Sequence, residues 1–176
     1  MTKQFNTGET QETLRQDYNP DGSVLRRAQM RMLDMAIYLQ ETAKKIGVPL
    51  RLDGGNVLGA LRHGGFIPWD DDIDMVVSQK DFKRLCDYLK AHPHPHYVLQ
   101  DNSTDRGFYK EWACLRDLRT ENRSHETSES ENRRIHEAQK YRGLHVDIFP
   151  YEGNMIPWLQ RFAAKLSVNV NLKMAG

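Results

Sequence analysis

A run of carboxylates that passes directly into an apolar segment constrains this chain more than any other feature. Four aspartates occupy residues 70–74, and the apolar residues 75–77 follow. A β-branched, apolar run of this kind predicts a buried strand. On a strand, residues two apart share a face at roughly 7 Å, so Asp72 and Asp74 are expected side by side. Neighbouring carboxylates raise each other's pKa or require a cation, and oxygen ligands suit Mg²⁺ or Mn²⁺.

The acidic run has two other interpretations. Asp70 and Asp71 could be solvated loop residues, and a purely structural role for Asp72 and Asp74 stays open. A calcium loop of the helix–loop–helix type requires Gly at the sixth position and Glu at the twelfth. Counted from Asp70, these positions hold Met and Asp, so that pattern fails.

A third carboxylate is expected from a second strand. Residues 144–149 alternate apolar side chains around Asp147, and we expect Pro150 to end this strand. An acid between Val and Ile is placed to complete a metal site with Asp72 and Asp74. The alternative is a buried Asp that only makes hydrogen bonds.

A glycine pair precedes the acidic run. A short strand at residues 50–52 leads into Gly54 and Gly55, and a helical pattern of apolar residues follows. Glycine allows a backbone to approach a ligand, and a helix N-terminus offers N–H groups to phosphate. Asn56 is expected as the N-cap. The pair matches neither GxxxxGK[ST] nor GxGxxG, so it is informative only beside the acids.

Three basic residues and one aromatic residue are candidates for contacts to a substrate. Arg62 and His63 end the helical pattern, and Arg116 lies in an apolar segment. These three could contact phosphate oxygens, although an Arg in the last turn can also complement the helix dipole. Trp69, directly before the acids, could stack on a nucleotide or form a wall of its site.

The order of these segments resembles the nucleotidyltransferase superfamily. Residues 53–63 and 65–74 closely resemble the LicD family, which contains bacterial phosphorylcholine transferases and is related to fukutin-type ribitol-phosphate transferases. Residues 115–120 and 143–150 are similar to two further strands of that family. The resemblance covers residues 25–158 and implies an α/β (α+β) fold with a small mixed sheet flanked by helices.

The chain departs from the family pattern in three places. Asn56 stands where a hydroxyl residue is more common, and Cys114 stands where a lysine is common. The sequence ends at Gly176, where members usually continue with a helical part. We therefore expect a polar N-terminal arm at residues 1–23 and a single catalytic domain at residues 24–176 that lacks this extension.

The resemblance implies a function for the acidic residues. It implies a phosphotransferase that moves phosphocholine, or a similar phospho-alcohol, from a CDP-activated donor to a hydroxyl of a glycan or lipid-linked saccharide. Mg²⁺ or Mn²⁺ would be held by Asp72, Asp74 and Asp147, and Asp71 or Asp70 could accept the proton of that hydroxyl. Nucleotidyl transfer from an NTP is the alternative reaction. A non-catalytic nucleotide or glycan binder is the alternative class.

Composition narrows the range of partners. The 25 basic and 24 acidic residues nearly balance, which argues against indiscriminate nucleic-acid binding. Cys86 and Cys114 lack metal-ligand spacing and indicate a reducing cytoplasm. We expect no signal peptide and no membrane-spanning segment. The amphipathic residues 155–174 could pack on the sheet or lie on the inner face of the membrane.

Further elements follow from periodicity. Residues 24–46 predict a long amphipathic helix that Gly47 closes, and Ser78 is expected to cap a second helix. Residues 108–118 predict a strand, and the charged residues 121–142 predict a surface loop. The His-Pro repeat at residues 92–96 is interpreted as a structural linker, with a zinc site as the alternative.

Overall fold

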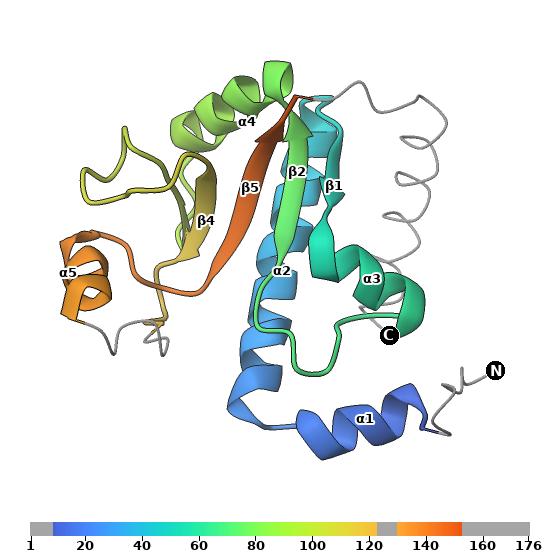
Figure 1. Ribbon diagram of the computed structural model, residues 1–176. Coiled ribbons are helices and arrows are strands. Elements are labelled where there is room, and N and C mark those ends of the chain that lie inside the picture. The colour runs from blue at the N-terminus through green and yellow to red at the C-terminus, as the bar shows by residue number, and fades with distance from the viewer. Residues whose placement is uncertain (1–8, 123–129, 153–176) are drawn as a thin grey trace.

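The computed structural model describes residues 9–122 and 130–152, and it contains helices packed around one sheet (Figure 1). The helices are α1 (Gln11–Tyr18), α2 (Val24–Lys45), α3 (Gly54–Arg62), α4 (Gln79–Ala91) and α5 (Ser130–Ala138). The strands are β1 (Leu50–Leu52), β2 (Asp74–Ser78), β3 (Tyr97–Gln100), β4 (Ala113–Asp117) and β5 (His145–Tyr151).

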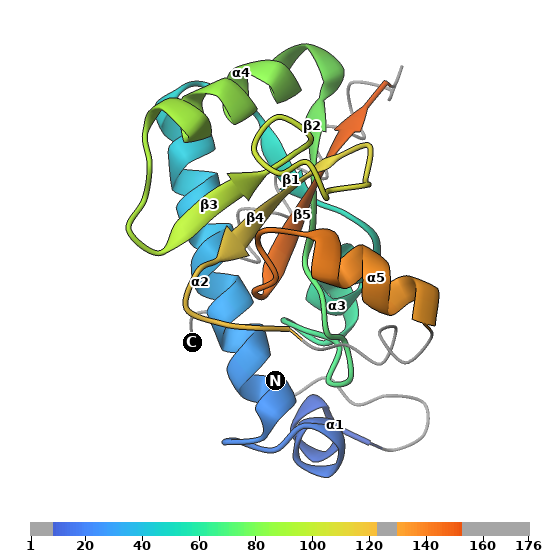
Figure 2. The ribbon, with the colours of Figure 1, turned by 90° about the vertical axis from the view of Figure 1, so that its left-hand side faces the viewer.

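The five strands form one mixed sheet in the order β1-β2-β5-β4-β3. β2 and β5 pair in parallel, and the other three pairings are antiparallel. Strands and helices alternate from β1 to β3, and helices flank the sheet (Figures 1 and 2). The predicted α/β (α+β) fold with a small mixed sheet is therefore confirmed.

The two faces of the sheet differ in polarity because side chains alternate along each strand. Met75 and Val77 of β2 are fully buried, as are Val146 and Ile148 of β5, and all belong to the hydrophobic core. The intervening positions carry Asp74, His145 and Asp147 at one end and the apolar Val76 and Phe149 farther along the strands. One face is therefore the core and the other presents the candidate site.

Helix α2 forms the main support of the apolar face. Met32, Met35 and Leu39 are no more than 2 % exposed, and they recur at the helical period. Ser23 accepts a hydrogen bond from the backbone N–H of Arg26 as the N-cap, and Gly47 adopts φ +68° just past the last turn. The predicted helix and its closure are confirmed, and its methionines pack in the core.

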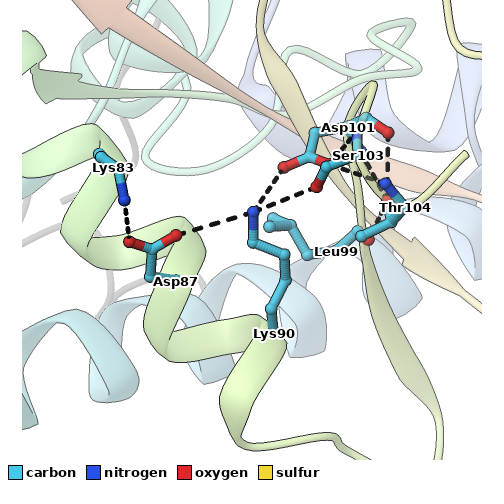
Figure 3. Close-up of polar contacts among 7 residues, drawn as sticks. All are labelled: Lys83, Asp87, Lys90, Leu99, Asp101, Ser103 and Thr104. Carbon is cyan, nitrogen blue, oxygen red and sulfur yellow. Dashed lines mark hydrogen bonds and ion pairs between the residues drawn. The ribbon is translucent and has the colours of Figure 1, made fainter.

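Helix α4 is fixed to the turn that follows β3 (Figure 3). The Nζ of Lys90 lies 3.1 Å from Asp101 Oδ2 and 3.3 Å from Ser103 Oγ. Asp101 Oδ1 in turn accepts the backbone N–H groups of Ser103 and Thr104.

Ser78 is the N-cap residue of α4, as predicted, but its hydroxyl donates to Asp81 instead of accepting from the helix backbone.

Two strand boundaries differ from the predictions. Residues 108–112 are not in a strand, because a turn closed by the Phe108 N–H to Asp105 carbonyl bond delays β4 until Ala113. β5 does not end at Pro150 but continues to Tyr151. β4 reaches only as far as Ile148, so Pro150 pairs with β2 alone and its missing N–H removes no bond to β4.

The charged segment 121–142 is not a simple loop, because it contains α5. The chain just after α5 is anchored by Asp105, whose Oδ2 accepts the backbone N–H of Lys140 at 2.7 Å. Gln139 also bonds to Gln100 and Arg116. These tertiary contacts stabilise a helix that the sequence pattern does not predict.

The N-terminal arm also contains a helix. Thr10 and Thr13 form a reciprocal capping box at the start of α1, and Leu14 is buried. Residues 1–8 and the amphipathic segment 155–174 lie outside the described residues. Within the described part of the chain, no helix is long and apolar enough to cross a membrane.

Candidate active site

The site begins where β2 and β5 lie side by side. Asp74 is the first residue of β2, and Asp147 is its direct partner in the parallel ladder. Neighbouring residues in a ladder point to the same face, so the two carboxylates share one face of the sheet. Asp72 lies before the strand, in an exposed connection, so the predicted strand starts two residues later than expected.

Asn56 fixes the segment that carries the acids. Its Nδ2 donates to the carbonyl of Asp72 at 3.1 Å, and its Oδ1 accepts the backbone N–H of Asp74 at 2.6 Å. The predicted N-cap role is wrong, because Asp53 occupies that position and Asn56 lies inside α3. Since Asn56 is buried and bonds the backbone on both sides of Ile73, it acts as a clamp on the acidic segment.

The two glycines bring the start of α3 against the carboxylates. A Cβ on Gly54 would stand 3.5 Å from Asp74 Oδ2, and one on Gly55 would stand 3.2 Å from Asp70 Oδ2. Gly54 also has φ +52°, a conformation that side-chain-bearing residues rarely adopt. The structure thus brings together the predicted glycines and acids, and it aligns the N-terminus of α3 with them.

Electrostatics at the acids are those of crowded, partly buried carboxylates. Burial, reinforced by Asp72 and Asp71, raises the pKa of Asp70 to about 6. Burial, reinforced by Asp72 and Asp147, raises the pKa of Asp74 to about 6. The pKa of Asp72 is also raised, first by burial and then by Asp71. Asp70, Asp72 and Asp74 are therefore harder to ionise than in water, as expected for partly buried like charges that lie close together.

The donor set fits a hard divalent cation. The carboxylate oxygens of Asp70, Asp71 and Asp72 lie within 4.8 Å of one another, and Asp70 Oδ2 is buried without a hydrogen-bond partner among the described residues. Oxygen ligands with unsatisfied acceptors suit Mg²⁺ or Mn²⁺. The predicted ligands are divided: Asp72 belongs to this group, Asp147 to a second group, and Asp74 lies beside Gly54.

Asp147 has its own partners. The Nζ of Lys110 lies 3.1 Å from its Oδ2 and 3.3 Å from its Oδ1, and the thiol of Cys114 donates to Oδ1 at 2.7 Å. Burial alone would raise the pKa of Asp147, but the Lys110 ammonium and the Cys114 thiol outweigh it and lower the pKa. Asp147 is consequently the acid of this site that is held ionised by neighbouring groups.

The second group of potential ligands is formed by Cys114, His145 and Asp147. Arg116 donates to His145 Nδ1 at 3.1 Å, and His145 Nε2 lies 3.5 Å from Lys110 Nζ and 3.7 Å from Asp147 Oδ2. Burial and then Arg116 lower the pKa of His145 to about 3. Burial raises the pKa of Cys114, which keeps the thiol protonated. Both side chains are thus already engaged with neighbouring protein groups.

Arg116 is a buried connector rather than a surface cation. Its guanidinium bonds to Gln100, Gln139 and His145 and to the carbonyl of Gly143. Only 6 % of its surface is exposed. The structure therefore places Arg116 behind His145, one residue removed from Asp147, and its predicted contact with phosphate stays a prediction.

The other predicted residues lie at the far end of α3. Arg62 is the exposed last residue of the helix. The Nδ1 of His63 lies 2.5 Å from Gln11 Oε1, which ties it to α1. Trp69 is 54 % exposed, and its ring centroid is 5.2 Å from that of Tyr18. Trp69 adjoins Asp70 in sequence, whereas a hydrogen bond connects His63 to the N-terminal helix.

Lys110 and His145 are site residues that sequence reasoning missed. His145 had a detectable signal, because it lies two positions before Asp147 and so shares its face of the strand. Cys114 is the direct ladder partner of Asp147. Lys110 lies outside regular structure, and no spacing rule connects it to Asp147.

A mixed sheet whose acids meet a glycine-started helix defines the class of nucleotidyltransferase-like domains. The family profile described as "LicD/FKTN/FKRP, nucleotidyltransferase domain" matches residues 47–165. The chain belongs to this family.

Named relatives agree with the family. The chain is 30% identical over 131 residues to "Lipopolysaccharide cholinephosphotransferase LicD" of Haemophilus influenzae, and the aligned region covers 73% of this chain and 44% of that protein. It is 32% identical over 120 residues to human "Ribitol 5-phosphate transferase FKRP", covering 64% and 20%. It is 34% identical over 67 residues to mouse "Ribitol-5-phosphate transferase FKTN", covering 38% and 14%. The chain thus spans less than half the length of each of these relatives.

Proposed function

We propose that this domain transfers a phospho-alcohol, such as phosphocholine, from a CDP-activated donor to a hydroxyl of a glycan or lipid-linked saccharide. The observation that carries the proposal is the row of carboxylates against the glycine-started helix α3, in a chain whose relatives are named phosphate-group transferases. Because the chain spans only part of those relatives, its activity, donor and acceptor are all part of the proposal.

The reaction divides its tasks among the residues of the site. Asp72, Asp74 and Asp147 would hold Mg²⁺ or Mn²⁺, which when bound supplies positive charge to the phosphates of the donor. Gly54 and Gly55 let the N-terminus of α3 lie close to the carboxylates, and the backbone N–H groups there would favour the negative charge of the donor's phosphates. Asn56 keeps Asp72 and Asp74 in register with that helix.

The transfer step is an in-line displacement at the phosphorus that bears the alcohol. A bond forms from the acceptor oxygen to phosphorus, and the bond from that phosphorus to the oxygen of CMP breaks. CMP leaves with the electron pair, and a carboxylate oxygen of Asp71 takes the proton of the acceptor hydroxyl. Asp71 is exposed beside the other acids, which is the reason for preferring it over the partly buried Asp70.

The test combines binding with turnover. Thermal stability is measured with CDP-choline, CDP-ribitol, CTP or ATP, each with and without Mg²⁺, and released CMP or pyrophosphate is measured in parallel. Stabilisation by one CDP-alcohol only in the presence of metal, together with CMP release, is the expected result. A response confined to NTPs would replace the proposal with nucleotidyl transfer. Binding of a nucleotide without any product would leave a binding domain.

A further inference from the structure

The ion pair between Lys110 and Asp147 occupies a carboxylate to which a metal ion would bind. The ammonium straddles the carboxylate, at 3.1 Å from Oδ2 and 3.3 Å from Oδ1. The side chains of Lys110 and Asp147 are only 15% and 12% exposed, so water screens their charges weakly. Asp147 is therefore already neutralised by a cation that belongs to the protein.

A divalent cation and this ammonium cannot share the carboxylate without strong repulsion. A Mg²⁺ ion binds a carboxylate oxygen at about 2.1 Å. With Lys110 Nζ 3.1 Å from Oδ2, an ion on that oxygen would be no more than about 5 Å from the ammonium. Two like charges at this separation in a weakly screened site repel strongly.

Lys110 also lies close to an aromatic ring. It lies in the irregular segment before β4, so its backbone is not fixed by a strand or helix. Its Nζ is 5.1 Å from the centroid of the Trp112 ring, a distance at which an aromatic face attracts a cation. This ring contact exists in the ion-paired position, and a rotation of the side chain away from Asp147 and toward the ring would keep it.

We propose that Lys110 is a tethered counter-ion that holds the Asp147 carboxylate until a divalent cation binds, and that the cation displaces it. This inference rests on the proposed function, since it takes Asp147 as a metal ligand. It assigns Lys110 the role of a positioning residue that sets the metal affinity of the site and orients Asp147 beforehand.

The test compares metal affinity among lysine variants. Mn²⁺ binding is followed by electron paramagnetic resonance of the free ion, for the wild type, Lys110→Met, Lys110→Arg and Lys90→Met. Lys90 is a matched control, because its ammonium also lies 3.1 Å from an aspartate oxygen, that of Asp101, away from the acidic site (Figure 3). We expect Lys110→Met to bind Mn²⁺ about tenfold more tightly, because the competing charge is gone. Lys110→Arg and Lys90→Met should stay near the wild-type value.

A second measurement uses the wild-type protein and so does not depend on the folding of a variant. Acetylation of each lysine by acetic anhydride is quantified by mass spectrometry with and without Mg²⁺. We expect Mg²⁺ to increase labelling of Lys110 and to leave Lys90 unchanged, since only Lys110 is released from its carboxylate.

The outcomes separate the two proposals. If the wild type binds Mn²⁺ but Lys110→Met binds it equally or more weakly, or if Mg²⁺ fails to increase labelling of Lys110, the counter-ion role is wrong and the metal site stands. If the wild type binds no divalent cation, both the metal-dependent reaction and the exchange are wrong.

Discussion

At the scale of single residues, Asp74 connects Asp147 with the start of α3. It is the ladder partner of Asp147, and its Oδ2 lies against Gly54 at the start of α3. Asp147 by contrast is already neutralised by Lys110. A metal ion should therefore contribute most of its stabilisation through Asp74 and the neighbouring Asp72.

Replacing Asp74 by Asn tests this directly. Asp74→Asn keeps the shape of the side chain and removes one like charge, so the metal-free protein should melt no lower than the wild type. The increase in melting temperature caused by Mg²⁺ should disappear, and turnover should fall at least about 100-fold, since even indirect supporting residues of metal sites contribute up to this factor. Asp87→Asn, on the exposed surface of α4, should behave as the wild type. A metal-free protein that no longer folds would mean that Asp74 is structural.

Asn56 should matter for stability as well as for the site. Asn56→Ala removes both bonds of the clamp and leaves the backbone N–H of Asp74 without its partner. Such a buried, unpaired group costs about 1–3 kcal/mol. Denaturant unfolding should show this loss, whereas Gln16→Ala on the exposed side of α1 should not. Full stability with unchanged metal affinity would show that the clamp has no role.

Sequence reasoning found the acids but not their partners, for a physical reason. Asp147 is detectable because an acid between apolar strand residues is rarely accidental, and the glycines are detectable because few other residues adopt φ > 0. Lys110 reaches Asp147 across 37 residues of sequence from an irregular segment, and local patterns carry no information about such contacts. Asn56 was assigned a local capping role, while its actual partners come from the neighbouring strand.

At the scale of elements, α3 is the part whose packing controls the site. Gly59 lies where the helix meets the returning chain, and a Cβ there would stand 2.6 Å from the carbonyl of Gly65 and 3.0 Å from the N of Ile67. Both obstacles are backbone atoms, which cannot rotate away. The glycine is therefore needed for close approach and not for a special φ angle.

Gly59→Ala should destabilise the protein although alanine favours helix formation. The gain in helix propensity is about 1 kcal/mol, and forcing the chain segments apart costs about 1–3 kcal/mol or more, so we expect a net loss in chemical denaturation. Gly55→Ala in the same helix is the comparison, because its Cβ would meet only the side chain of Asp70. If both variants unfold alike, close packing at Gly59 does not limit stability.

The elements predicted correctly are those whose own sequence specifies them. Helix α2 has a long apolar stripe and a closing glycine, and β2 and β5 have apolar runs. Helix α5 lacks such a stripe and depends on Asp105 and Gln139, which contact the chain around it. β4 is shorter than predicted because a turn at residues 105–108 precedes it and residues 109–112 are irregular, and side-chain pattern alone does not reveal this.

At the scale of the whole molecule, the core and the site use opposite faces of one sheet. Asp117 is the charged link on the core face: its buried carboxylate lies 2.6 Å from Nε of Arg31 in α2 and 3.0 Å from Nε of Arg119. It thus connects the supporting helix to β4. Arg116, the next residue toward the start of β4, belongs to the opposite, polar face. Alternation along a single strand therefore serves stability and the site together.

The link through Asp117 should make global stability depend on pH. Burial would raise the pKa of Asp117, but Arg119 and Arg31 outweigh it and lower the pKa below its ordinary value. A carboxyl with a lowered folded-state pKa stabilises the protein above its unfolded pKa of about 3.9, and this stabilisation is lost as pH falls through the folded pKa. Asp117→Asn should therefore lower the free energy of unfolding by about 2 kcal/mol near neutral pH, because both arginines lose their charged partner.

The measurement is urea unfolding of the wild type and Asp117→Asn from about pH 7 to about pH 3. The difference in free energy of unfolding should be largest near neutral pH and should shrink below about pH 4, as the wild-type carboxyl becomes protonated. All other carboxyls titrate in both proteins, so their contributions cancel in the difference. A difference that stays constant across this range would show that Asp117 acts through packing, and that charge does not connect α2 to the sheet.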